Sequence, residues 1–114
     1  MTFIKHPMPP IQPTPKEART EGYWEILNTV EDPEIGVGIV DLGLIYTVEI
    51  GEDKSHVMMS LTSMACPAGP ELIGRVEEEM KAITGGKPCT VEVVWEPVWN
   101  PDMIDPDIRI MLGM

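Results

Sequence analysis

Residues 44–62 read LIYTVEIGEDKSHVMMSLT, and their alternation of apolar and polar side chains predicts an antiparallel β-hairpin. We expect the first strand over 44–50 and the second over about 56–62, joined by the polar turn GEDK. Val57 and Met59 share one face of the second strand, because successive side chains of a strand point to opposite faces. The hairpin therefore supplies the centre of a sheet that has one apolar face.

Downstream of the hairpin, the sequence predicts a helix, a strand and one further short element. The segment SMACPAGP at 63–70 cannot continue the strand, and apolar residues then recur at helical spacing over 70–83 until a glycine pair ends the pattern. A third strand is expected over 89–95. The last segment, 105–113, contains an N-cap aspartate, a proline at the first helical position and a terminal glycine, which favours a short helix. Its apolar residues also alternate, so a fourth strand is the alternative.

Upstream of the hairpin, the sequence predicts another helix. It ends before Asp32-Pro33, because the residue before a proline avoids the α region. The sequence TPKE at 14–17 has the pattern of a capping box with proline at the first helical position, so the helix is expected to begin there. Gly22 weakens the middle of this helix, and a start near Thr20 remains open.

The order of these elements defines the expected domain. Five prolines within residues 1–15 predict an extended, flexible tail, and residues 16–114 are expected to form a single domain. The order α-β-β-α-β, followed by the short C-terminal helix or strand, predicts a two-layer α+β fold with a mostly antiparallel sheet. A chain of 114 residues with 43% apolar residues is long enough for one core of its own.

The amino-acid composition disfavours two kinds of binding partner, nucleic acids and membranes. Nineteen acidic residues against eight basic ones give a net charge of −11, which disfavours binding to nucleic acid or to an anionic membrane surface. No apolar run is long enough to cross a bilayer, and the first residues lack the pattern of a signal peptide. A cytoplasmic location is therefore expected.

Cys66 carries the strongest chemical signal in the chain. It follows a predicted strand and precedes a predicted helix, and the N-terminal end of a helix favours the thiolate, which is the nucleophilic and metal-binding form. A buried, unreactive thiol is the alternative, and packing is expected for Cys89 at the start of a strand. Two cysteines and two histidines do not supply a closed four-ligand metal site, so any metal at Cys66 is expected to be transient or shared.

Three carboxylates and one histidine are candidate partners of Cys66. Asp32, Glu34 and Asp41 precede the first strand, and the expected strand order allows their loop to approach Cys66; capping of loop N–H groups is the alternative. His56 begins the strand that leads to Cys66, so about 3.3 Å per residue places it roughly 20 Å away, too far for a general base. No catalytic residue is assigned, and the chain is predicted not to be an enzyme.

Five motifs run in order through the domain: DPE at 32–34, VDLGLIY at 40–46, LT at 61–62, CPAGP at 66–70 and WEPVWNPDM at 95–103. Together they resemble the metal–sulfur cluster biosynthesis family, which contains SufT-type and PaaD-type proteins and the eukaryotic targeting components of cytosolic iron–sulfur protein assembly. The resemblance covers roughly residues 20–114. Five separated motifs in one order are much more specific than any one of them.

The resemblance implies a small α+β domain that matures iron–sulfur proteins as a carrier or a targeting adaptor. It implies that Cys66 is the reactive cysteine, with Asp32, Glu34 and Thr62 as supporting residues and a transient iron–sulfur cluster as the bound group. One cysteine cannot hold a cluster alone, so external thiols, a homodimer, assembly proteins or client apo-proteins would complete its ligands.

Three alternatives to this function remain open. The first is a cysteine-dependent hydrolase or thiol transferase, which the absence of a well-placed histidine disfavours. The second is a pure protein–protein adaptor in which Cys66 serves only for contact. The third is a PaaD-like role in oxygenase assembly, which is less expected because no cysteine follows Cys89.

Overall fold

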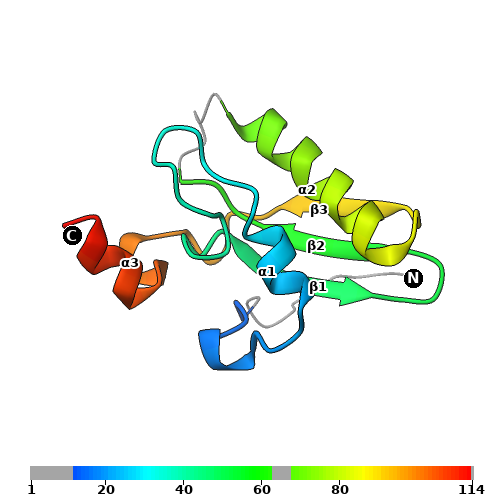
Figure 1. Cartoon of the computed structure of the whole chain (residues 1–114), viewed down its shortest axis with the longest axis horizontal. Helices are drawn as coiled ribbons and strands as arrows, with labels where there is room; N and C mark the ends of the chain where they lie inside the picture. The colour runs from blue at the N-terminus through cyan, green and yellow to red at the C-terminus, as the bar shows by residue number, and fades with distance from the viewer. Residues whose placement is uncertain (1–11, 63–67, 114) are drawn as a thin grey trace.

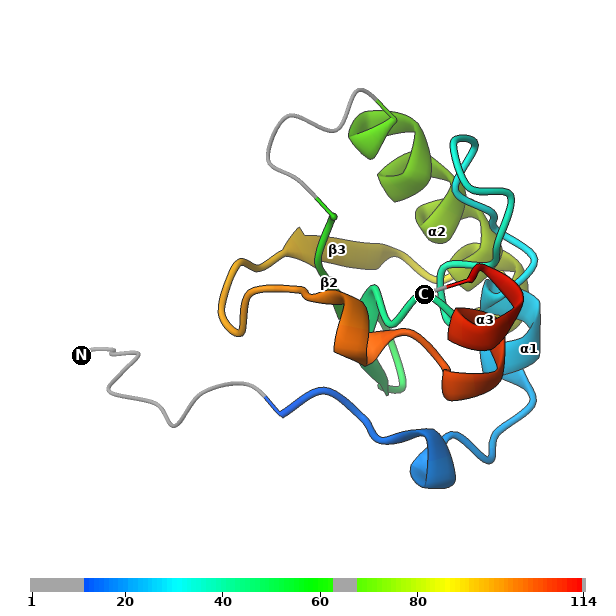
Figure 2. The same cartoon turned by 90° about the vertical axis from the view of Figure 1, so that its left-hand side faces the viewer.

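The computed structural model describes residues 12–62 and 68–113, so Cys66, His6 and most of the predicted tail lie outside the described residues (Figure 1). Its elements, in chain order, are η1 (Lys16–Ala18), α1 (Tyr23–Leu27), β1 (Ile45–Ile50), β2 (Ser55–Met59), α2 (Gly69–Thr84), β3 (Cys89–Val93), η2 (Pro101–Met103) and α3 (Pro106–Met111). The predicted two-layer α+β fold is confirmed, with α1 and α2 packed over the sheet (Figures 1 and 2).

The sheet has the order β1-β2-β3. β1 and β2 form the predicted antiparallel hairpin, whereas β3 pairs with β2 in parallel, with Ser55 opposite Cys89 and Met59 opposite Val93. The parallel pairing follows from the long connection through α2, because only a crossover can bring the chain back to start a strand in the same direction. The segment β2–α2–β3 is therefore one βαβ unit with an antiparallel strand added to it.

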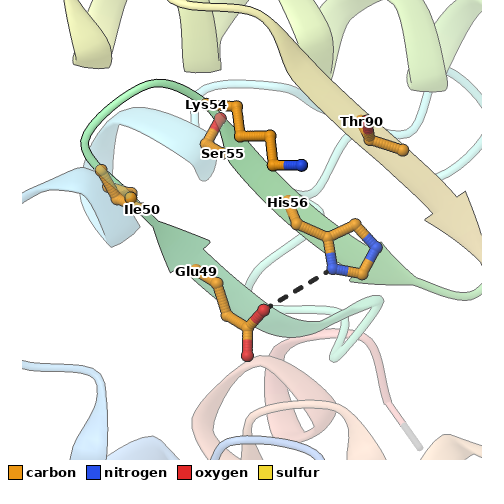
Figure 3. A pocket seen from close by; sticks show the side chains of 7 residues that line it. Glu49, Ile50, Lys54, Ser55, His56 and Thr90 are labelled. Carbon is orange, nitrogen blue, oxygen red and sulfur yellow. Dashed lines mark ion pairs between the residues drawn. The ribbon is translucent and has the colours of Figure 1, made fainter.

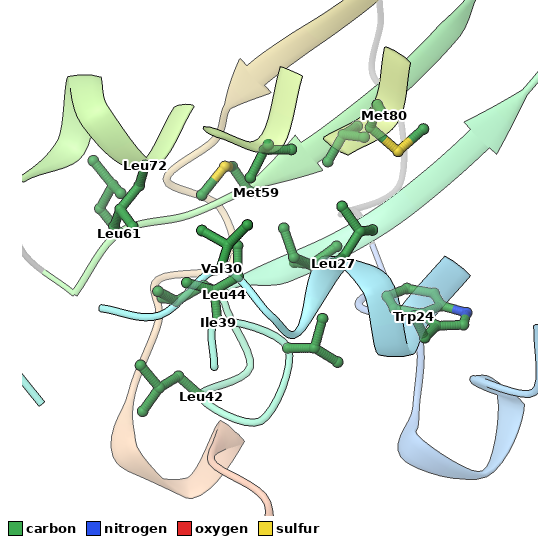
Figure 4. Packing of buried hydrophobic residues seen from close by; sticks show 14 of the residues in the cluster. Trp24, Leu27, Val30, Ile39, Leu42, Leu44, Met59, Leu61, Leu72 and Met80 are labelled. Atoms are coloured by element: carbon green, nitrogen blue, oxygen red, sulfur yellow. The ribbon is translucent and has the colours of Figure 1, made fainter. Parts of the chain in front are cut away.

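The core lies between the sheet and the two larger helices. Both Val57 and Met59 of β2 are fully buried, as their predicted face requires. Figure 4 shows side chains from α1, the following loop, β2 and α2 meeting in one cluster. Its labelled members are Trp24, Leu27, Val30, Ile39, Leu42, Leu44, Met59, Leu61, Leu72 and Met80.

The predicted start of the first helix at the TPKE sequence is wrong. Thr14 does not cap a helix, because its backbone N–H and its hydroxyl both donate to the carbonyl oxygen of Tyr46, at 2.8 and 2.9 Å. Pro15 is extended, and α1 begins only at Tyr23 after Gly22, nearer to the alternative start at Thr20. A hydrogen bond to a distant strand has replaced the local cap.

Strand β1 departs from strict alternation at its first residues. The pairing with β2 is irregular between Ile45 and Thr47, so Ile45 and Tyr46 are both buried. The hydroxyl of Tyr46 donates to the carbonyl oxygen of Pro97 at 2.8 Å, and the indole N–H of Trp99 donates to the carbonyl of Leu42 at 2.7 Å. These two bonds hold the C-terminal segment against the rest of the domain.

The C-terminal element is a helix, as the N-cap pattern favoured, and not a fourth strand. The side chain of Asp105 accepts a hydrogen bond from the N–H of Asp107 at 2.9 Å, and Gly113 follows the helix with φ of 76°. No helix within residues 12–62 and 68–113 has the length and apolar character needed to span a bilayer.

Candidate functional site

The described residues that flank Cys66 in the chain lie at the end of the sheet where β2 ends and α2 begins. We call this the cysteine end and define it by Thr62, Ala68 and Gly69, which flank the undescribed residues 63–67 in the chain. Gly69 packs closely on Leu61, since a Cβ atom at Gly69 would lie 3.0 Å from Leu61 Cδ1. Both views place the loop of residues 31–38 at the same end of the molecule as the start of α2 (Figures 1 and 2).

Asp32 is buried within this loop and forms hydrogen bonds that hold the loop together. The residue is only 2% exposed, and its carboxylate Oδ1 accepts a hydrogen bond from the N–H of Glu34 at 2.8 Å. Its carbonyl oxygen accepts from the N–H of Gly36 at 2.7 Å, and its own N–H donates to the carbonyl of Val37 at 3.0 Å. The capping interpretation therefore describes Asp32, whereas the side chain of Glu34 is exposed.

Asp41 is held by α1 rather than by the loop of residues 31–38. The Asn28 side chain donates to Asp41 Oδ2 at 3.0 Å and accepts from the Asp41 N–H at 2.9 Å. Gly38 packs directly on Asn28, so a Cβ atom at Gly38 would collide with the oxygens of Asn28. Asp41 thus lines a pocket of about 290 Å³ together with Lys16 and Arg19, whose lining does not include Asp32 or Glu34.

Two basic side chains of that pocket join segments that are distant in the sequence. Lys16 Nζ lies 2.6 Å from Asp105 Oδ2, and this hydrogen bond lowers the pKa of Asp105 and raises the pKa of Lys16. Arg19 donates to the carbonyl oxygens of Thr14 and Val40 at 3.1 and 3.3 Å, and burial lowers its pKa. The pocket is therefore a junction that joins the N-terminal segment to the start of α3.

A second pocket, of about 480 Å³, lies at the opposite end of the sheet. We call this region the hairpin end: residues 49–56 together with Thr90 and Glu92. Figure 3 shows the side chains of Glu49 and His56 facing each other from neighbouring strands. His56 Nδ1 is 3.7 Å from Glu49 Oε1, and His56 Nε2 is 3.1 Å from Glu92 Oε1, so both ring nitrogens face carboxylates.

Sequence analysis did not identify this cluster, although part of its signal is present. Strand alternation places Glu49 and His56 on the face opposite the apolar one, but the contact with Glu92 depends on the parallel pairing of β3. Cys89 is half-buried against the core at this same end, beside Ser55, which confirms its predicted packing role. Within residues 12–62 and 68–113, no group of three or more histidine, cysteine or acidic side chains is arranged to hold a metal ion.

The fold and the sequence together define the class. Residues 24–93 match the model of the iron–sulfur cluster assembly protein family, and the chain belongs to this family. The predicted family resemblance is thereby confirmed.

Individual relatives agree with this assignment. The chain is 39% identical over 100 residues to the Fe-S protein maturation auxiliary factor YitW of Bacillus subtilis, covering 87% of this chain and 98% of the relative. It is 41% identical over 86 residues to the Fe-S protein maturation auxiliary factor SufT of Staphylococcus aureus, covering 75% and 98%. A crystal structure of a domain of unknown function (DUF59) from Bacillus anthracis superposes with a TM-score of 0.73 at 31% identity, covering 81% and 89%.

Proposed function

We propose that this chain assists the maturation of iron–sulfur proteins, as a carrier or a targeting adaptor, and that Cys66 is the residue this role requires. The observation that carries the proposal is the family match over residues 24–93, together with relatives that are named as Fe-S protein maturation auxiliary factors. The position of Cys66 in the chain, between β2 and a long helix, supports its choice over Cys89.

The supply of ligands favours transient rather than permanent binding of a cluster. Iron–sulfur clusters are usually held by about four thiolates, and the chain has two cysteines. Cys89 is half-buried beside Ser55 at the hairpin end, whereas the described residues on either side of Cys66 lie at the cysteine end. A cluster on Cys66 would therefore take its other ligands from a partner or from free thiols, and could be passed on.

The carboxylates of the predicted site differ in burial and in hydrogen bonding. Asp32 is buried and its carboxylate accepts a hydrogen bond within its own loop, so we assign it a structural role in that loop. Glu34 is exposed, and the side chain of Asp41 is bonded to Asn28. Among these acids, Glu34 is therefore the one most available to contact a client or an iron atom, and Thr62 is the described residue that precedes the segment with Cys66.

A role without catalysis fits the placement of the histidine better than the enzyme alternative does. A cysteine nucleophile needs a base within hydrogen-bonding reach. His56 lies at the start of β2, and both its ring nitrogens face carboxylates from the adjoining strands. We therefore propose that the chain delivers or recruits, and does not turn over a substrate.

The test is a deletion strain complemented with the wild-type gene, with Cys66→Ser or with Cys89→Ser. We expect Cys66→Ser to leave aconitase activity as low as in the deletion, whereas Cys89→Ser should restore it, and an enzyme without a cluster should be unaffected throughout. Full restoration of aconitase by Cys66→Ser would remove Cys66 from the mechanism and leave only the adaptor function. Protein levels measured by immunoblot separate loss of function from loss of folding.

A second experiment separates the carrier from the adaptor. The purified protein is reconstituted anaerobically with iron and sulfide, and visible absorption is recorded for the wild type, Cys66→Ala and Cys89→Ala. A carrier shows charge-transfer absorption that Cys66→Ala abolishes and Cys89→Ala retains. An adaptor shows none in any of the three, while still supporting aconitase in cells.

A further inference from the structure

The two edge strands of the sheet, β1 and β3, differ in how they are protected from pairing with another strand. Along β1, the N–H and hydroxyl of Thr14 both donate to the carbonyl oxygen of Tyr46, and the pairing with β2 is irregular between Ile45 and Thr47. Coverage and irregularity are the usual means of protecting an edge strand. On the outer side of β3, no strand of the described residues is paired.

The register identifies which backbone groups lie along this free edge. The N–H of Ser55 donates to the carbonyl of Pro88 at 3.0 Å, and the N–H of Val94 donates to the carbonyl of Met59 at 2.8 Å. In a parallel ladder the groups that face the neighbour belong to alternate residues, so the even-numbered residues of β3 bond to β2. The N–H and carbonyl groups of the odd-numbered residues point outward. These residues are Cys89, Val91 and Val93.

The side chains beside this edge are apolar and incompletely covered. Val57 and Met59, the β2 neighbours of Val91 and Val93, are 0% exposed, whereas both β3 residues are only half-buried. β3 has the sequence CTVEV, without proline, lysine or a bulge that would keep another strand away. An added strand would therefore complete both the hydrogen bonding and the burial at this side of the core.

Charge decides what kind of strand fits. Glu92 is the charged residue of β3, its side chain is 54% exposed, and Glu49 lies on the same face of the sheet two strands away. The chain as a whole carries a net charge of −11. A basic side chain placed opposite Glu92 is favourable, whereas a second copy of this chain would bring a further −11 and another glutamate-bearing strand.

We propose that the free edge of β3 binds an extended segment of another protein, in which apolar side chains facing Val91 and Val93 alternate with basic side chains facing Glu92. Such strand addition draws its affinity from main-chain hydrogen bonds and its specificity from alternate side chains. This inference rests on the proposed function and deepens it, because a maturation factor must recognise its clients or the machinery that it serves.

The experiment uses the acetylated and amidated peptide KVKVKVK as the probe, with EVEVEVE as its charge control. Binding to the full-length protein is followed by titration in amide-resolved NMR spectra. We expect KVKVKVK to shift the amide signals of Cys89, Val91 and Val93 most strongly, and EVEVEVE to leave them in place. A version of KVKVKVK that is N-methylated on alternate residues, so that one edge is blocked, should lose affinity.

Substitutions test the same contacts from the side of the protein. Val91→Pro removes an outward N–H and leaves the ladder to β2 intact, because proline is tolerated at such edge positions. Losing that bond should weaken binding about fivefold or more. The matched control Val91→Ala keeps the N–H and should retain the edge signals. Glu92→Gln should weaken binding about threefold, as expected for one cross-strand charge pair. The amide spectrum of each free variant verifies that it is folded.

Four outcomes would overturn the proposal. They are equal binding of KVKVKVK and EVEVEVE, unchanged affinity in Val91→Pro, peptide-induced shifts confined to the glutamates of α2 at residues 77–79, and a dimer of the free protein that Val91→Pro dissociates. The last outcome assigns the edge to a second copy of the chain. Failure here leaves the aconitase result for Cys66→Ser untouched, and failure of the cysteine test leaves peptide binding at β3 untouched, so the two proposals fail separately.

Discussion

The two ends of the sheet use their charged residues differently. At the cysteine end, Asp32 is 2% exposed, and its carboxylate accepts a hydrogen bond from the backbone of its own loop. At the hairpin end, Glu49, His56 and Glu92 form a partly exposed row across three strands beside the larger pocket. The first arrangement fixes the shape of the loop, and the second places a histidine between two carboxylates on a surface.

The two ends also differ in the cavities and elements that lie beside them. The lining of the larger of the two pockets includes Lys54 and the Glu49–His56 pair, and partly exposed pairs of this kind contribute little to stability. The cysteine end combines a tightly closed loop with the start of the longest helix. If the contrast is right, substitutions at the two ends will differ in predictable ways.

The largest difference is expected between two glycines. A Cβ atom at Gly38 would collide with the oxygens of Asn28, whereas one at Gly51 would meet only the carbonyl of Lys54, at 3.2 Å. Gly38→Ala should therefore lower the free energy of unfolding by about 3 kcal/mol, and Gly51→Ala by about 1 kcal/mol or less. Urea denaturation followed by circular dichroism measures both. Equal losses would mean that the loop of residues 31–38 is no more rigid than the hairpin turn.

The next effect concerns the carboxylate that closes the loop. Asp32→Ala should cost about 1 to 2 kcal/mol, as for the loss of a capping side chain, because the N–H of Glu34 loses its acceptor. Asp32→Asn keeps an oxygen in place and should cost less, and Glu34→Ala should be close to neutral because that side chain is exposed. The same urea titrations rank the three variants. A neutral Asp32→Ala would show that the loop does not depend on its buried acid.

A smaller effect is expected from the junction at the start of α3, and it depends on pH. The pKa of Asp105 is lowered from 3.8, chiefly by its hydrogen bond with Lys16. The ion pair therefore stabilises the fold above pH 3.8, and this contribution is lost as the pH falls through the lowered pKa. Asp105→Asn retains an acceptor for the N–H of Asp107 and removes the charge. The variant should be less stable than the wild type at pH 7 and indistinguishable from it in strong acid; a difference that persists there would implicate packing instead.

The smallest effect is expected at the hairpin end. His56→Asn removes the contacts with Glu49 and Glu92, and partly exposed pairs are worth about 0.5 kcal/mol or less. Thermal unfolding at pH 7 of the variant and the wild type provides the comparison. A loss of stability as large as that of Asp32→Ala would show that the contacts of His56 stabilise the fold as much as the buried Asp32 does. That result would contradict the proposed difference between the two ends.

Most of the fold could be predicted from local patterns. The alternation in residues 44–62 and the helical spacing in 70–83 are long and regular, and the Asp105-Pro106 start identified α3. The start of α1 could not be predicted in the same way, because a capping pattern is local whereas the bond from Thr14 to Tyr46 spans 32 residues. The parallel partner of β3 is likewise set by packing of α2 and not by the sequence of β3.

The candidate site also contains some contacts that follow from the local sequence and others that depend on tertiary structure. That Asp32 caps its own loop was foreseeable, since aspartate commonly accepts from the N–H two residues later. The attachment of Asp41 to Asn28, 13 residues away, and the meeting of His56 with Glu92, 36 residues away, depend on tertiary structure. The sequence therefore sufficed to identify the family but not to distinguish the roles of Asp32, Glu34 and Asp41.

One comparison in cells tests most directly which end of the domain carries the function. A deletion strain is complemented either with Cys66→Ser or with the double variant Glu49→Gln, His56→Asn, and aconitase activity is measured at matched protein levels. The account predicts wild-type activity for the double variant and the activity of the deletion for Cys66→Ser. Restored activity with Cys66→Ser, combined with loss in the double variant, would place the function at the hairpin end and contradict the account.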